Sequence, residues 1–179
     1  SAQATDVSQG RLPDGSATIV SFTGQSASPA CGNWSPNGVY INELLSNSSW
    51  PMEDAVEIAN ANAFAVDISG WWLSDDLYNR RKYRIPAGAT IPAGGYMVLY
   101  AANLATGTSP VEFNARGDET MLSAVNASGV LTGYGSLVRY GASAGNASFG
   151  RVDATGLNAT SGGAEFWPLT AHTFGCDDA

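Results

Sequence analysis

Short apolar runs separated by turn residues dominate the chain from residue 39 onward. Glycine or proline interrupts the sequence every few residues, and no window keeps apolar residues at the i, i+3, i+4 and i+7 spacing of an amphipathic helix. The runs are rich in β-branched and aromatic residues, which favour strands. The predicted strands are Val39–Leu45, Ala55–Ala59, Ala65–Ile68, Trp71–Ser74, Lys82–Ile85, Tyr96–Ala101, Thr120–Val125, Val130–Tyr134, Leu137–Tyr140 and Glu165–Leu169.

Regularly spaced short strands with turn signals between them predict an all-β sandwich or barrel. Residues 86–88 (PAG) and 92–95 (PAGG) mark two tight corners, because proline fixes φ and glycine leaves it free. Residues 1–36 differ, since they are rich in Ser, Ala, Thr and Gly and contain one plausible strand near residues 19–22. We therefore predict one domain over 37–179, preceded by a separate segment over 1–36.

Composition narrows the classes of partner. Charged residues make up 13% of the chain, the net charge is −8, and Lys82 is the single lysine. Because such a chain repels phosphate backbones and anionic lipid, we expect no nucleic-acid partner. No apolar run approaches the roughly 20 residues of a membrane span, so we expect no membrane insertion. A composition rich in small and polar residues and poor in charged ones favours an extracellular or cell-surface location.

Three motifs follow one another in a fixed order: Asp67-Ile68-Ser69-Gly70-Trp71, then Ile85-Pro86-Ala87-Gly88, then Ile91-Pro92-Ala93-Gly94-Gly95-Tyr96. This order resembles the lamin tail domain, found in nuclear lamins and in bacterial secreted proteins. The resemblance covers about 37–179 and implies an all-β, immunoglobulin-like β-sandwich. With SDD at 74–76 followed by KYRIP at 82–86, the chain looks most like bacterial modules attached to spore-coat-H-type kinases and nucleases.

The leading segment is similar to the end of the chain. Ser8-Gln9-Gly10-Arg11 matches Ser148-Phe149-Gly150-Arg151, 140 residues later, and the cysteines that follow the two segments, Cys31 and Cys176, are 145 residues apart. Since modules of this family end in such a segment, we interpret residues 1–36 as the tail of a preceding repeat or a linker with an extra strand. We expect residues 8–33 to pack along the edge of this chain's own sandwich or of a neighbouring one, with Phe22 buried and Arg11 hydrogen-bonded to backbone or carboxylate. For Cys31 and Cys176 two alternatives stay open, a mutual disulfide or two thiols unpaired within the chain.

Adjacent residues of a strand point to opposite faces, so Trp71 and Trp72 should have different surroundings. The resemblance implies that Trp71 lies in the core. Trp72 then faces outward, or it is covered by a loop or by residues of the N-terminal segment. An exposed Trp72 would be a stacking platform for sugar or a partner surface, with Tyr78, Arg80 and Arg81 nearby in sequence.

Asp75, Asp76 and Asn79 form an oxygen-rich stretch that is the chain's candidate calcium site. The alternative is an ordinary turn, which Asp and Asn favour without any metal. We expect no cofactor. The adjacent basic cluster at residues 80–84 is interpreted as a charged edge strand paired with Asp75 or Asp76.

Catalytic residues are hard to find. His172 is the sole histidine and lacks a spaced nucleophile and carboxylate. Glu43 and Glu57 have the side chains of a general acid and base pair, but the sequence indicates no cleft or partner for them. We expect both to accept hydrogen bonds from turn backbone. Structural roles are likewise expected for Gly70 and Pro86 in turns and for Arg11 and Arg151 in the two similar segments.

The sequence therefore predicts a non-catalytic interaction or spacer module of a larger secreted or cell-surface bacterial protein. Its expected partners are neighbouring domains of the same protein, or a protein or polysaccharide surface. The first alternative is a carbohydrate-binding module that uses Trp72, and the second is an unrecognised hydrolase.

Overall fold

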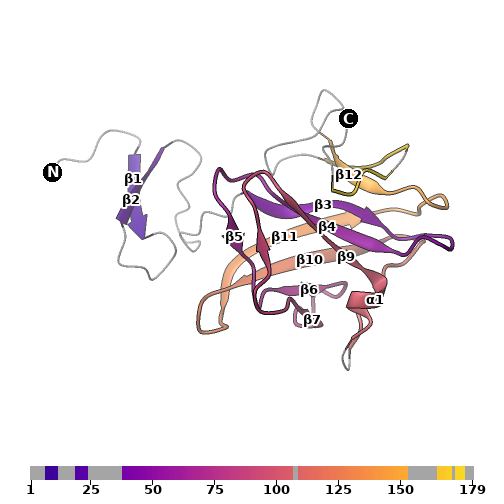
Figure 1. The fold of residues 1–179 in the computed structure, drawn as a ribbon, viewed down its shortest axis with the longest axis horizontal. Coiled ribbons are helices and arrows are strands. Elements are labelled where there is room, and N and C mark those ends of the chain that lie inside the picture. The colour runs from indigo at the N-terminus through magenta and orange to yellow at the C-terminus, as the bar shows by residue number, and fades with distance from the viewer. Residues whose placement is uncertain are drawn as a thin grey trace.

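Two antiparallel sheets face each other across an apolar core (Figure 1). The computed structural model describes residues 7–11, 19–23, 38–106, 109–152, 165–170 and 172–175. The five-stranded sheet has the order β13 (Glu165–Pro168), β12 (Phe149–Val152), β3 (Val39–Leu45), β4 (Ala55–Asn60) and β9 (Tyr96–Tyr100). The four-stranded sheet has the order β11 (Leu131–Tyr140), β10 (Asp118–Val125), β6 (Trp72–Ser74) and β7 (Tyr83–Arg84). The predicted all-β, immunoglobulin-like sandwich is confirmed.

The core lies between the sheets and is built by alternation along each strand. On β3, Val39, Ile41 and Leu44 belong to the core, and a register shift between Ile41 and Glu43 re-aims the residues that follow. Trp71 is 1% exposed, and its ring meets that of Tyr134 edge-on with centroids 6.2 Å apart. The core tryptophan implied by the resemblance is therefore in place.

A polar seam joins the two sheets along β3 and β11. The Ile41 amide donates to Ser136 Oγ at 3.0 Å, and Tyr134 Oη donates to the Val39 carbonyl at 2.6 Å. Arg151 is buried, donates from Nε to the Ile41 carbonyl at 2.6 Å, and lies over the ring of Tyr40. β12 pairs with β3 only at Glu43 and Leu44, so the backbone of Val39 and Ile41 has no partner on that side among the described strands. The side chains of Tyr134, Ser136 and Arg151 provide hydrogen bonds to it instead.

The chain segments that connect the two large sheets contain a small two-stranded sheet and tight turns. β5 (Val66–Asp67) pairs with β8 (Thr90–Ile91). Gly70 has φ +76°, and its amide donates to the Ile85 carbonyl at 2.9 Å, which fixes the entry to β6. Within the described residues, α1 (Ala101–Leu104) is the helix, and no helix there is long and apolar enough to cross a bilayer.

Several predicted strand bounds differ from the structure. The two strands expected over 130–134 and 137–140 are one long strand, β11. Gly133 and Gly135 suggested a break, but the ladder runs through Gly135, where an added Cβ would lie 2.8 Å from the Leu122 carbonyl oxygen. β1, β8 and β12 were not in the predicted set, because β8 is only two residues long and β1 and β12 each contain a single β-branched residue.

β1 (Val7–Arg11) and β2 (Ile19–Thr23) form a separate antiparallel pair, drawn to one side of the sandwich in Figure 1. For the described backbone, the prediction that residues 8–33 add a strand to this chain's own sandwich is wrong, whereas packing along a neighbouring sandwich stays a prediction. The two strands pair with each other and join neither large sheet. Because β1 and β2 pair many of their backbone N–H and C=O groups with each other, fewer of these groups remain to pair with the edge of a large sheet. The side chains of Arg11 and Phe22 lie outside the described residues.

Candidate functional site

Two buried glutamates lie opposite each other on neighbouring strands. Glu43 on β3 pairs in register with Glu57 on β4, and both side chains have 0% exposure. Ser148 Oγ donates to Glu43 Oε1 at 2.5 Å, and Asn42 Nδ2 donates to Glu57 Oε1 at 2.9 Å. Buried carboxylates need such donors, because an unpaired one would bear a large desolvation cost.

The same carboxylates hold residues 172–175, which we call the strap. The Thr173 amide donates to both carboxylate oxygens of Glu43 at 3.0 and 3.1 Å, and its hydroxyl donates to Oε2 at 3.0 Å. The Gly175 amide donates to Glu57 Oε2 at 2.5 Å. We expected Glu43 and Glu57 to accept hydrogen bonds from turn backbone, and the strap supplies those donors from more than 110 residues away along the chain.

Alternation along the strap places its other two side chains on a pocket. Thr173 and Gly175 meet the glutamates, whereas His172 and Phe174 line the pocket and contact each other with ring centroids 5.8 Å apart. The strap pocket has a volume of about 470 Å³. Its remaining lining residues come from the end of β3, the following loop and the end of β9: Leu45, Pro51, Met52, Glu53 and Tyr100.

Hydrogen bonds tie the walls of the strap pocket to one another. Glu53 Oε2 accepts from the Ala102 amide at 3.0 Å, which joins the loop after β3 to the start of α1. Asp54 reinforces that junction, since its carbonyl accepts from Ala101 at 2.8 Å and its carboxylate accepts from Ser48 at 2.8 Å. The pocket is therefore formed by several restrained segments in the folded chain.

Aromatic surface is exposed at this end of the sandwich. Tyr100 is 44% exposed, and Trp50, the residue before the pocket's Pro51, is 93% exposed. Sequence reasoning missed this site. The available signal was a tryptophan and a proline in the loop between two strands, and His172 was weighed only as a catalyst. What the sequence could not show is that the strap reaches the end of β3.

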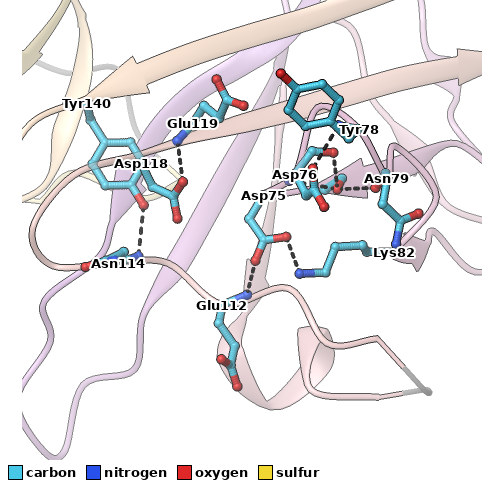
Figure 2. A network of polar contacts seen from close by, with 11 residues as sticks. Asp75, Asp76, Tyr78, Asn79, Lys82, Glu112, Asn114, Asp118, Glu119 and Tyr140 are labelled. Carbon is cyan, nitrogen blue, oxygen red and sulfur yellow. Dashed lines mark hydrogen bonds and ion pairs between the residues drawn. The ribbon is translucent and has the colours of Figure 1, made fainter.

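The predicted calcium residues lie in a turn, and both carboxylates make contacts within the chain (Figure 2). Asp75 forms an ion pair with Lys82, and its Oδ2 accepts from the Glu112 amide at 2.9 Å. Asp76 Oδ1 accepts from the Tyr78 amide at 2.8 Å. In the part of the chain that the structure describes, no three acidic, His or Cys side chains are grouped as metal ligands.

Ser74 closes this turn from inside. Its hydroxyl donates to the Asn79 carbonyl at 2.6 Å and accepts from the Asp76 amide at 3.0 Å. Asp75 and Lys82 form the ion pair expected for the basic edge strand. The geometry of these residues is that of a side-chain-stabilised turn.

Trp72 lies on β6 opposite Arg84 of β7, in a half-buried position. The Arg84 guanidinium carbon lies 6.0 Å from the centre of its ring, and the ring also packs against the core. One aromatic face is thus occupied by the chain itself, which weakens Trp72 as a sugar platform. The residues expected beside it, Tyr78, Arg80 and Arg81, are exposed.

Other predicted residues have structural positions or lie outside the description. Pro86 is exposed and, with Gly70, lines a pocket of about 330 Å³ beside Arg84. Cys31 and Cys176 lie outside the described residues. As catalysts, Glu43 and Glu57 are poorly placed, because both are fully buried and their oxygens accept hydrogen bonds from the chain itself.

A family model described as the Lamin Tail Domain matches residues 34–137, which is more than half of the chain. The family has an immunoglobulin-like, non-catalytic fold and is often a protein-interaction module. Comparisons with curated proteins and with solved structures gave no significant match. Strands β12 and β13 and the strap lie beyond the matched residues, so the match does not extend to the wall of the strap pocket that His172 and Phe174 form. The chain belongs to the lamin tail domain family.

Proposed function

We propose that this chain is a non-catalytic interaction module of a larger secreted or cell-surface protein, and that the strap pocket contacts its partner protein. The observation that carries the proposal is the strap pocket itself, a hollow of about 470 Å³ lined by three rings and a carboxylate. Concave, largely apolar sites with a few polar groups are the usual form of binding sites.

The exposed aromatic residues beside the pocket support the same conclusion. Trp50 and Tyr100 keep large apolar surfaces in water, at 93% and 44% exposure, next to the pocket. Tryptophan and tyrosine dominate the energetic centres of protein interfaces, since they bury much area with little loss of rotamer freedom. In the larger protein, the module would also space its neighbouring domains.

A carbohydrate partner is the second candidate, and Trp50 is the observation that favours it. An indole that is 93% exposed can stack on a sugar ring, whereas Trp72 already stacks with Arg84. If the partner is a carbohydrate, the stacking residue is therefore Trp50 in the loop after β3, in place of Trp72 on β6.

Selection from a random peptide library displayed on phage tests the proposal without assuming a ligand. The full chain should select peptides with a shared consensus, and the double variant Tyr100→Ala/Phe174→Ala should bind a synthetic consensus peptide at least about tenfold more weakly. That loss corresponds to about 1.4 kcal/mol.

The matched control removes exposed apolar side chains elsewhere. Phe64→Ala/Val130→Ala truncates two residues that are 54% and 57% exposed and do not line the strap pocket, so it should bind the peptide like the wild type. Selection of no consensus, or equal binding by the pocket variant, would contradict the proposal. Binding to a polysaccharide panel that is lost with Trp50→Ala would favour the second candidate instead.

A further inference from the structure

The strap pocket combines apolar walls with one negative charge. Pro51 and Met52 supply aliphatic surface above the fully buried Leu45, and Glu53 places a carboxylate at the same hollow. Glu53 Oε2 accepts from Ala102, while Oε1 makes no hydrogen bond to any residue that the structure describes. A ligand group that donates hydrogen bonds or carries positive charge would therefore find an acceptor there.

The rings of the pocket favour the same charge. Tyr100, His172 and Phe174 all line it, and aromatic rings attract cations through their quadrupoles. The lining residues include no lysine or arginine, and the whole chain carries a net charge of −8. The field around the pocket thus attracts basic groups from a distance as well as at contact.

From this combination, and resting on the proposed function, we propose that the strap pocket takes one long basic side chain, arginine or lysine, from a partner protein. Such a side chain has an aliphatic stem and a charged head. The stem packs against Pro51 and Met52, and the head lies between the rings and the Glu53 carboxylate.

Other ligand classes match the pocket less well. An anionic group would face Glu53 without a lysine or arginine among the described lining residues to compensate it. A sugar would set hydroxyl groups against Pro51 and Met52, where they lose hydrogen bonds to water without replacement. A wholly apolar side chain would desolvate the Glu53 carboxylate without supplying a cation to pair with it.

The test uses three capped tripeptides that differ only at the central residue. Acetyl-Gly-Arg-Gly-amide carries the cation, the citrulline peptide keeps nearly the same shape without charge, and the norleucine peptide keeps only an aliphatic stem. Titrations into the ¹⁵N-labelled full chain are followed through backbone amide shifts. We expect the arginine peptide to shift the amides of Tyr100, Ala102 and Phe174, and to bind at least about fivefold more tightly than the citrulline peptide.

Variants of the protein isolate the carboxylate. Glu53→Gln should remove the preference for arginine over citrulline, while Glu112→Gln, which neutralises an exposed acid outside the pocket, should keep it. Higher salt should weaken the arginine peptide more than the norleucine peptide, because only the former relies on charge. Folding of each variant is checked by its amide spectrum.

Three results would overturn the inference: equal binding of the arginine and citrulline peptides, no shift at the pocket with any peptide, or a preference that survives Glu53→Gln. The proposed function fails separately. If phage selection gives a pocket-dependent consensus without a basic residue, the strap pocket is an interaction site and only its ligand class is wrong. A pocket that selects no consensus and binds no tripeptide removes both.

Discussion

Trp71 and Trp72 are neighbours in sequence with opposite surroundings. Trp71 is buried against Tyr134, whereas Trp72 is half-buried with Arg84 over its ring. Truncating a buried aromatic residue costs about 3–5 kcal/mol, so Trp71→Ala should lower the free energy of unfolding by that amount. Trp72→Ala should cost clearly less. Urea denaturation measures both, and the reverse order would mean that the facing of this strand is misassigned.

The buried Tyr140 and the half-buried Tyr134 predict how stability depends on alkaline pH. Burial raises the pKa of Tyr134 to about 12 and raises that of Tyr140 as well, with Asp118 adding to the shift at Tyr140. Below pH of about 10 both phenols are protonated in the folded and the unfolded chain. Between about 10 and 12 the unfolded chain releases protons that the folded chain retains, so the free energy of unfolding falls as pH rises.

Thermal melts from pH 8 to 12 check this dependence. The melting temperature of the wild type should drop above about pH 10, and Tyr134→Phe should show a shallower drop, because it has no phenol to ionise. Tyr78→Phe alters a fully exposed tyrosine and serves as the matched control. Parallel curves for the wild type and Tyr134→Phe would show that Tyr134 does not contribute.

At the scale of elements, the strap depends on hydrogen bonds to the glutamate pair. Thr173→Val removes the hydroxyl that donates to Glu43 Oε2 at 3.0 Å and keeps the backbone amide in place. A hydrogen bond to a buried charged group contributes about 1.5–3 kcal/mol, so stability should fall by up to that amount. Amide hydrogen exchange at Gly175 should speed up, because the strap is then held less firmly.

Thr106→Val provides the comparison, since Thr106 is exposed and donates to the Asn103 carbonyl outside the strap. It should change stability by less than about 0.5 kcal/mol. If Thr173→Val is as mild and leaves the exchange of Gly175 unaltered, the carboxylates do not hold the strap.

Strand positions were largely predictable from the sequence because each is encoded locally. Alternating apolar residues and Pro-Gly corners placed β3, β4, β6 and β9 to within a residue or two. The joining of two predicted strands into β11 was not predictable, because a glycine in a ladder and a glycine in a turn look alike in sequence. Here the pairing of Gly135 with Ser123 of β10 makes the glycine part of a strand.

At the scale of the whole molecule, the sandwich was predictable and the strap pocket was not. The motifs at residues 67–96 indicated the family, and the family implies the fold. The pocket instead depends on contacts such as Thr173 with Glu43, which are 130 residues apart in the chain. No local pattern encodes a contact of that range, so both glutamates carried only a general expectation of hydrogen bonding.

The central claim is that partner contact occurs at the strap pocket, and one measurement tests it most directly. The consensus peptide from phage selection is titrated into the ¹⁵N-labelled chain, and the shifted amides are mapped on the structure. The account predicts that the largest shifts fall on Met52, Glu53, Tyr100 and Phe174. Shifts centred on Trp72 and Tyr78, or on the exposed Trp167 of β13, would place the contact elsewhere and contradict it.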